Sequence, residues 1–445
     1  MGKRIRLNSP HFHNSGLEAK VAKCQTAADF ERLREGLKRA GAFDFPCHPT
    51  GLYPAVGTGS LREATSGYTN VWVRDNIHVA YALLRDGQTK RARRVACQLA
   101  RYFRAHSRRF RQGILRPSLF RDPMQRPHIR FDGSTLKELP VEWSHAQNDA
   151  MGYFLWFYCL LIDEGVIPTA EVDRGLLSLF VLFFKSIRYW QDEDSGHWEE
   201  IRKVAASSIG TVVAALERLE RLMVQETLAL RKERGLPRVD IQMVRRLKRQ
   251  GETALNGILP AECLQSHGQK RRRYDAATLF LIYPLQVVDA KSADAIMDSV
   301  RGHLQGAIGI KRYLRDSYWA ADFRGRVLEC ERTVDYSCDL TKRDTLHRHV
   351  REAQWCIFDP IVSIIYGRRF RQTGRARDRK CQRHYLLRSL AQLTDDRGDY
   401  LPLRCPELYF LEGGRFVPND HTPLLWTQAH LLSALHEMVL TLKAC

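Results

Sequence analysis

Apolar residues recur at helical spacing along almost the whole chain, and this regularity most constrains how it can fold. In residues 26–40, for example, Phe30, Leu33 and Leu37 repeat every three to four positions behind Thr26, a typical helix N-cap. Strict alternation of polar and apolar residues, which marks a half-buried strand, is nearly absent. The pattern therefore predicts an all-α protein of about ten to twelve helices.

The predicted helices come in pairs that are joined by longer segments. They cover residues 26–40, 77–84, 89–106, 148–164, 169–190, 203–223, 275–288, 292–304, 352–367, 377–393 and 423–443. Long loops between successive helical hairpins, such as residues 113–144, are often functional and are typical of a helical toroid. We therefore expect one domain over residues 26–445, preceded by a polar N-terminal arm at residues 1–25. No repeat of a regular solenoid is visible.

The chain carries a formal net charge of +20 over its 445 residues. Such a balance suits an acidic partner, but the basic residues are dispersed and form no recognisable nucleic-acid-binding motif. We therefore expect no specific nucleic-acid partner. The most charged segment, near residues 226–252, is interpreted as a helical insertion. It is either a solvated helix or a binding site for a regulatory partner protein.

The eleven cysteines are scattered without a Cys-x-x-Cys pair, which argues against a zinc ribbon and against a disulfide framework. The N-terminus lacks the apolar core of a signal peptide, and no apolar run reaches about 18 residues. These features predict a cytoplasmic protein without a membrane span. The histidine pairs His11/His13 and His347/His349 lack a third acidic partner, and no glycine-rich nucleotide motif is present. We expect neither a metal nor a cofactor.

Five expected loop-to-helix junctions combine aromatic, acidic, amide and basic residues. They lie at residues 72–76, 142–149, 196–200 and 312–319, and at 406–409 together with 426–430. Tryptophan faces stack on sugar rings, while carboxylates, amides and guanidinium groups bind hydroxyls through paired hydrogen bonds. Any one junction, taken alone, is better explained by helix capping and core packing. Five in one chain indicate a carbohydrate site.

The junction at 196–200 places Trp198 directly before two carboxylates, Glu199 and Glu200. A carboxyl group against an aromatic face loses hydration, which raises its pKa and makes it a proton donor near neutral pH. Cleavage of a glycosidic bond needs such a donor. Because neighbouring residues point in different directions, only one of the two carboxylates can reach the bond. A carboxylate pair favoured by a helix dipole is the structural alternative.

Taken in order, these junctions resemble those of glycoside hydrolase family 15, the glucoamylases and glucodextranases, and of the related regulatory α and β subunits of phosphorylase kinase. The matching pieces are Trp72-Val-Arg-Asp75, Trp143-Ser-His-Ala-Gln147-Asn-Asp149-Ala, Gly196-His-Trp198-Glu199-Glu200, Asp275-Ala-Ala, Arg312-Tyr313 with Asp316 and Tyr318, Pro406-Glu407-Leu-Tyr, and Pro423-Leu-Leu-Trp426-Thr-Gln-Ala-His. The resemblance covers residues 45 to 443. No single motif is specific, but the ordered set is.

The resemblance implies an (α/α)6 barrel with the site at its wide end. It implies an inverting, exo-acting hydrolase of α-glucosidic bonds in which Glu199 is the general acid and Glu407 the general base. In such an enzyme the two carboxyl groups lie about 6.5–9.5 Å apart, so that a water molecule fits between them. The residues implied to bind or support sugar are Trp72, Arg74, Asp75, Trp143, His145, Gln147, Asp149, Trp198, Glu200, Arg312, Asp316 and Trp426. The kinase-subunit branch implies the alternative, a carbohydrate-binding regulatory protein without catalysis.

Overall fold

The computed structural model describes residues 10, 12, 14–57, 67–266, 268, 270–334, 336–347, 351–396 and 399–444. His11, His13 and His349, discussed above as candidate metal ligands, lie outside the described residues. The described part is mainly helical, as the sequence predicts, with five short strands.

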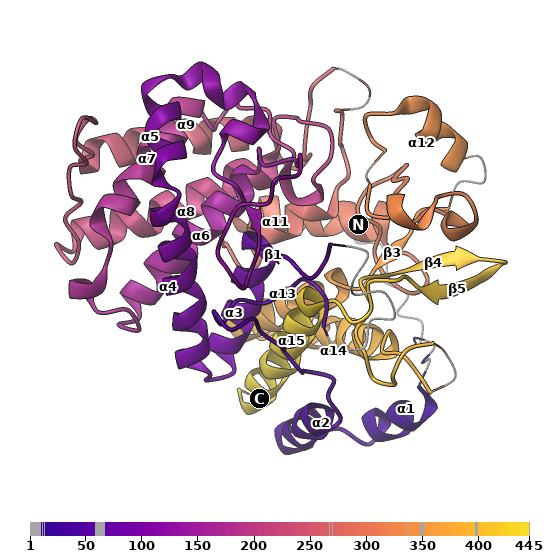
Figure 1. Ribbon diagram of the computed structural model, residues 1–445. Coiled ribbons are helices and arrows are strands. Elements are labelled where there is room, and N and C mark those ends of the chain that lie inside the picture. Colours follow the sequence, from indigo (N-terminus) through magenta and orange to yellow (C-terminus); the bar gives the residue numbers. More distant parts are fainter. Residues whose placement is uncertain are drawn as a thin grey trace.

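Among the described residues, six inner helices form a closed ring. In chain order they are α3 (Val73–Arg85), α6 (Asn148–Asp163), α8 (Ala206–Val224), α10 (Leu279–Ile282), α13 (Phe358–Thr373) and α15 (Leu425–Lys443). Each helix contacts the next, and α15 packs against α3 to close the ring. Figure 1 shows α3, α13 and α15 side by side in the middle of the molecule.

Six further helices of the described chain cover this ring from outside. They are α2 (Ala27–Arg39), α4 (Thr89–Ala105), α7 (Arg174–Ile187), α9 (Ile241–Ile258), α11 (Ala290–Ser299) and α14 (Ala376–Ala391). They pack on α15, α3, α6, α8, α10 and α13 respectively. The predicted all-α architecture is confirmed, and the arrangement is an (α/α)6 barrel.

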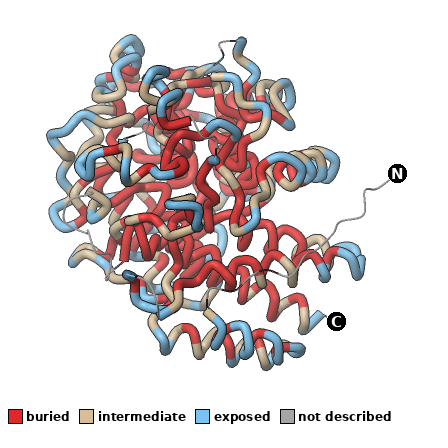
Figure 2. The backbone as a smooth tube through the Cα atoms, turned by 90° about the vertical axis from the view of Figure 1, so that its right-hand side faces the viewer, coloured by how far each residue is buried: buried red, intermediate tan, exposed pale blue. Residues whose placement is uncertain are grey.

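Burial explains why the inner and outer helices differ in sequence. All residues of α6 from Asn148 to Ile162 are buried, because a helix surrounded by others has no face toward solvent. The outer helix α4 instead buries a single stripe that includes Val95 and Leu99 and turns its arginines outward. Figure 2 shows the same division, with buried segments inside and exposed ones around the rim.

The remaining elements lie in the connections between the barrel helices. Helices α5 (Ser107–Leu115) and α12 (Leu340–Leu346) belong to long loops, and β1 (Val71–Trp72) pairs with β2 (Arg130–Phe131). A second sheet has the antiparallel order β3 (Gln354–Trp355), β4 (Leu408–Glu412), β5 (Arg415–Pro418). No described helix is long and apolar enough to cross a membrane.

Two expectations about the organisation of the chain need correction. The arm expected at residues 1–25 contains a helix, α1 (Ser15–Ala22), which Asn14 caps and which buries Leu17 and Val21. The charged segment near 226–252 is not an insertion, because α9 is an outer barrel helix that buries Val244 and Leu247 on α8. Its charges form the solvent face of this helix, and residues 226–240 form the loop that leads into it.

The helix expected at residues 275–288 is much shorter in the structure. A 3-10 turn (Ala276–Thr278) runs into α10, which ends at Ile282. Pro284 explains this end, because a residue before proline is disfavoured in the helical conformation, and Tyr283 is extended, with φ −141° and ψ 127°.

Candidate active site

A cavity of about 560 Å³ opens where α3 and α15 begin. Its ionisable lining includes Arg74, Asp75, Glu142, Glu199, Arg312 and Glu407, and its aromatic lining Tyr68, Trp72, Trp143, Trp198, Tyr318, Trp355 and Trp426. All five junctions singled out in the sequence contribute to this wall. The volume and the mixture of aromatic and polar groups are typical of a site for a small ligand.

Glu199 is presented to the cavity by an unusual backbone conformation. It ends the 3-10 turn Gly196–Trp198 with a left-handed φ of 58°. Residues other than glycine rarely adopt this conformation, and such strain concentrates at functional sites. Arg74 Nη2 donates to Glu199 Oε1 at 3.2 Å, while 18% of the side chain stays exposed. The carboxyl group is thus held on one side and accessible on the other.

Glu407, by contrast, is enclosed by hydrogen-bonding groups. Asn419 Nδ2 donates to its Oε2 at 2.5 Å, and His421 Nδ1 lies 2.9 Å from the same oxygen. The Tyr68 hydroxyl donates to Oε1 at 3.4 Å, and the Tyr68 ring stacks on His421 at a centroid distance of 3.7 Å. The hydroxyls of Tyr68 and Tyr318 are 3.0 Å apart. These partners fix the orientation of the Glu407 carboxylate.

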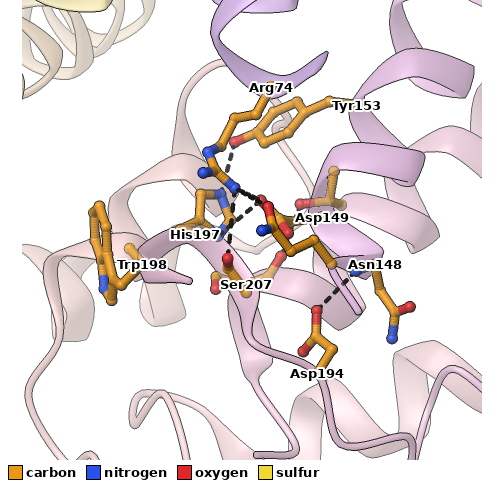
Figure 3. Close-up of polar contacts among 12 residues, drawn as sticks. Arg74, Asn148, Asp149, Tyr153, Asp194, His197, Trp198 and Ser207 are labelled. Carbon is orange, nitrogen blue, oxygen red and sulfur yellow. Dashed lines mark hydrogen bonds and ion pairs between the residues drawn. The ribbon is translucent and has the colours of Figure 1, made fainter. Parts of the chain in front are cut away.

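Arg74 links the first three junctions through one buried guanidinium group (Figure 3). Its Nη1 donates to Gln147 Oε1 at 2.9 Å and to Asp149 Oδ2 at 2.8 Å. Burial alone would raise the pKa of Asp149, but Arg74 lowers it below its ordinary value. Gln147 and Asp149 do not line the cavity. Their effect on a ligand would act through the position of Arg74.

Asp75 follows Arg74 in the first turn of α3 and lines the cavity. Burial raises the pKa of Asp75 to about 7; Arg74 opposes this shift, and Glu199 and Glu407 add to it. At neutral pH such a carboxyl group can donate as well as accept a hydrogen bond, which suits the recognition of sugar hydroxyls.

Arg312 is a second buried cation in the cavity wall. Its Nε and Nη2 donate to the two carboxylate oxygens of Asp316, both at 2.7 Å. Its guanidinium carbon lies 4.9 Å from the ring centroids of both Tyr318 and Trp355. A bidentate ion pair between aromatic faces fixes the plane of the guanidinium group. Asp316 itself does not line the cavity.

Two predicted site residues point away from the cavity. Glu200 accepts from Lys203 Nζ at 2.6 Å and from Arg272 Nη2 at 3.1 Å. Burial would raise the pKa of Glu200, but Arg272 and Lys203 lower it strongly. His145 stacks on His128 at 3.7 Å, and burial lowers the pKa of His145 to about 2. Neither side chain lines the cavity in this structure.

The sequence reading missed Trp355, Tyr68, Asn419 and His421. Trp355 stands shortly before α13, much as Trp72 stands before α3, so its position carried a usable signal. Tyr68, Asn419 and His421 lie in loops that only the fold brings to Glu407. No local pattern marks them.

Asp194 is a buried residue whose Oδ2 accepts from the backbone N–H of Asn148, at the start of α6, at 2.8 Å (Figure 3). Its ionisation should make the stability of the fold depend on pH. Burial, reinforced by Asp149, raises the pKa of Asp194 to about 7. An unfolded aspartate ionises near pH 3.9, so the folded state binds the extra proton between about pH 4 and 7. Protonation of Asp194 therefore stabilises the folded wild type at low pH, and this contribution to the free energy of unfolding is lost as pH rises through that window.

We expect Asp194→Asn to remove this pH-dependent contribution to stability. Its stability relative to wild type should rise between pH 4 and 7 by on the order of 1 kcal/mol or more and then level off. Urea unfolding at pH 4, 5.5, 7 and 8 measures this difference. A difference that does not vary with pH would contradict the shifted pKa.

Comparison with known proteins finds a related family. The sequence model described as "Glycosyl hydrolases family 15" matches residues 46–223, which include the first three junctions and Glu199. The chain is related to glycoside hydrolase family 15. The match does not extend to Arg312 or Glu407, whose place in the site is seen only in the structure.

Solved structures of a glycosidase and of a glucoamylase share the fold of this chain. A glycosidase variant solved in complex with glucose superposes with a TM-score of 0.65 at 15% identity, covering 94% of this chain and 100% of that one. The glucoamylase of Saccharomycopsis fibuligera gives a TM-score of 0.61 at 13% identity, covering 99% and 98%. At these identities the likeness shows the barrel fold alone.

A curated relative belongs to the second branch of the predicted relationship. It is the probable phosphorylase b kinase regulatory subunit alpha of Drosophila melanogaster, 26% identical over 296 residues, or 60% of this chain. The aligned region covers 22% of that subunit, so the chain corresponds to about a fifth of its length. Both branches of the predicted relationship are therefore confirmed.

Proposed function

We propose that the chain is an inverting, exo-acting glycoside hydrolase that cleaves α-glucosidic bonds. The observation that carries this proposal is the meeting of two carboxyl groups, Glu199 and Glu407, in the lining of one cavity. Glu199 would protonate the glycosidic oxygen, and Glu407 would activate a water molecule on the opposite face of the sugar. The separation of about 6.5–9.5 Å that this chemistry needs remains a prediction.

The different surroundings of the two carboxyl groups support their assignment. A general base must hold its carboxylate in a fixed direction toward water, and Glu407 is oriented by Asn419, His421 and Tyr68. A general acid must reach the leaving oxygen, and Glu199 remains partly exposed with Arg74 on one side. The placement of donors around each group therefore favours Glu407 as the base and Glu199 as the acid.

The remaining cavity residues suit the binding of a terminal sugar. Arg74, Asp75 and Arg312 offer donors and acceptors for hydroxyl groups. The rings of Trp72, Trp143, Trp198 and Trp426 form walls on which a pyranose can stack. We assign Gln147, Asp149 and Asp316 to the orientation of the two arginines, and Glu200 and His145 to support of the surrounding loops.

A closed end to the cavity supports exo action. Behind Trp426 the barrel is filled by buried rings: His78 lies 4.9 Å from the Trp426 centroid, 4.9 Å from His430 and 5.3 Å from Phe280. The filled core closes the bottom of the cavity, and a chain end fits such a blind pocket. The substrate should therefore be cleaved from its terminus.

A second candidate is a carbohydrate-binding regulatory protein, and one finding favours it specifically. The Drosophila relative is a kinase regulatory subunit. In that case the same cavity would bind sugar without turnover, and the solvent face of α9 with the 226–240 loop would be available to a partner protein.

A turnover screen separates the two candidates. The purified protein is incubated with α-linked glucose disaccharides and p-nitrophenyl glycosides, and sugar binding is measured in parallel by calorimetry. We expect turnover of at least one α-glucoside. Binding without turnover would support the regulatory function, and absence of both would contradict a sugar site.

A further inference from the structure

One helix of the inner ring is too short to reach the end of the barrel away from the cavity. Helix α10 has four residues, whereas its neighbours α8 and α13 have 19 and 16. At 1.5 Å per residue α10 spans about 6 Å, against about 28 and 24 Å. Helix α10 ends at Ile282, and each of its two longer neighbours carries an arginine in its second half, Arg218 on α8 and Arg368 on α13.

Both arginines pack on aromatic rings. Arg368 Nη2 lies 3.5 Å from the Tyr81 hydroxyl, and its guanidinium carbon is 4.6 Å from the Tyr283 centroid. The Arg218 guanidinium carbon is 5.4 Å from the Trp156 centroid, and Trp156 in turn packs on Tyr81 at 5.3 Å. Arg368 thus contacts Tyr81 directly, and Arg218 lies over Trp156, the ring that packs on Tyr81.

The carboxylates near Arg218 and Arg368 lie beyond good hydrogen-bonding distance of them. Asp163 Oδ2 lies 3.8 Å from Arg218 and 3.7 Å from Arg221, and Glu437 Oε2 lies 3.9 Å from Arg368. All three distances exceed the 2.7–3.2 Å of a good hydrogen bond.

The local charge is positive. Glu437 is already hydrogen-bonded by Arg371, whose Nε donates at 3.0 Å. Within the described part of the chain, the ion pairs of Arg218, Arg221, Arg368 and Arg371 involve the two carboxylates of Asp163 and Glu437, so these pairs hold four cations against two anions. The adjacent Arg85–Glu164 pair is neutral as a unit.

We propose that Arg218, Arg221 and Arg368, with the Tyr81 hydroxyl beside Arg368, bind the phosphate group of a small soluble phosphomonoester. Guanidinium forks match phosphate oxygens bidentately, and an excess of two positive charges matches a phosphate dianion. The Arg218 and Arg368 side chains are only 20% and 22% exposed, so a recessed small ligand fits better than a flat polyanionic surface.

The test is calorimetry in HEPES buffer at pH 7.5 with two probes, inorganic phosphate and glycerol 2-phosphate. Both should bind to the full chain more tightly than chloride at equal ionic strength. Arg218→Gln and Arg368→Gln should each weaken binding at least tenfold. Arg246→Gln is the matched control, because it removes the same charge from an exposed position on α9 and should leave binding unchanged.

A charge-conserving variant separates loss of phosphate binding from misfolding of Arg218→Gln. Arg218→Lys keeps the charge but loses the planar fork, and it should weaken binding less than Arg218→Gln. Binding no tighter than that of chloride would overturn the proposal, as would equal losses in Arg246→Gln and Arg218→Gln. Attachment to phosphatidic acid vesicles without binding of either soluble probe would also overturn it, because the ligand would then be a membrane surface.

Discussion

Glu199→Gln is expected to lower kcat for an α-linked disaccharide by about 10²–10⁴-fold while sugar binding persists. The glutamine keeps the shape of the side chain and can still accept from Arg74, but it has no proton to give to the leaving oxygen. Steady-state kinetics and calorimetry with glucose measure the two effects separately. Glu217→Gln is the matched control, since Glu217 is an exposed residue of α8 outside the cavity lining, and it should stay near wild type.

The leaving group distinguishes the acid from the base. p-Nitrophenolate departs without protonation, so Glu199→Gln should lose much less activity on a p-nitrophenyl glucoside than on a disaccharide. Glu407→Gln should lose activity on both, because each reaction still needs activated water. The opposite pattern would exchange the two roles, and full activity of either variant on the disaccharide would refute the pair.

Arg74→Met is expected to destabilise the fold by about 3–5 kcal/mol. The substitution leaves the Asp149 carboxylate, with a side chain 0% exposed, without the guanidinium that balances its charge. Removing one partner of a buried ion pair costs more than removing both. The double variant Arg74→Met/Asp149→Leu should therefore recover part of the lost stability, although it should not recover sugar binding.

Urea unfolding of wild type, the single variant and the double variant measures this coupling. A single variant destabilised by less than about 1 kcal/mol would show that Asp149 does not depend on Arg74. A double variant less stable than the single one would show that the methionine, rather than the unpaired carboxylate, causes the loss.

The barrel could be predicted from the sequence because its helices carry their own local signals. Apolar spacing and N-caps such as Thr26 mark most helices, and the polar residues at the starts of α3, α6 and α15 mark the end where the site lies. The apolar stripe of α9, with Val244, Leu247 and Leu255, was equally visible. The charged residues around this stripe dominate the composition of residues 226–252, and they led to the wrong prediction of an insertion.

Parts of the site depended on tertiary structure and could not be predicted. The network around Glu407 comes from Tyr68 on one loop and from Asn419 and His421 on another, and nothing in either loop signals that they meet. Two neighbouring residues need not belong to the same site where the chain turns sharply. The left-handed conformation of Glu199 directs its neighbour Glu200 toward Lys203 and Arg272, away from the cavity.

The configuration of the first product tests the central claim most directly. Wild-type protein is mixed with p-nitrophenyl α-glucoside, whose leaving group is not a sugar, in an NMR tube, and the anomeric signals of the released glucose are followed before mutarotation mixes them. If water attacks opposite the leaving group between Glu199 and Glu407, β-glucose appears first. Initial release of α-glucose would contradict a water molecule placed between two carboxyl groups.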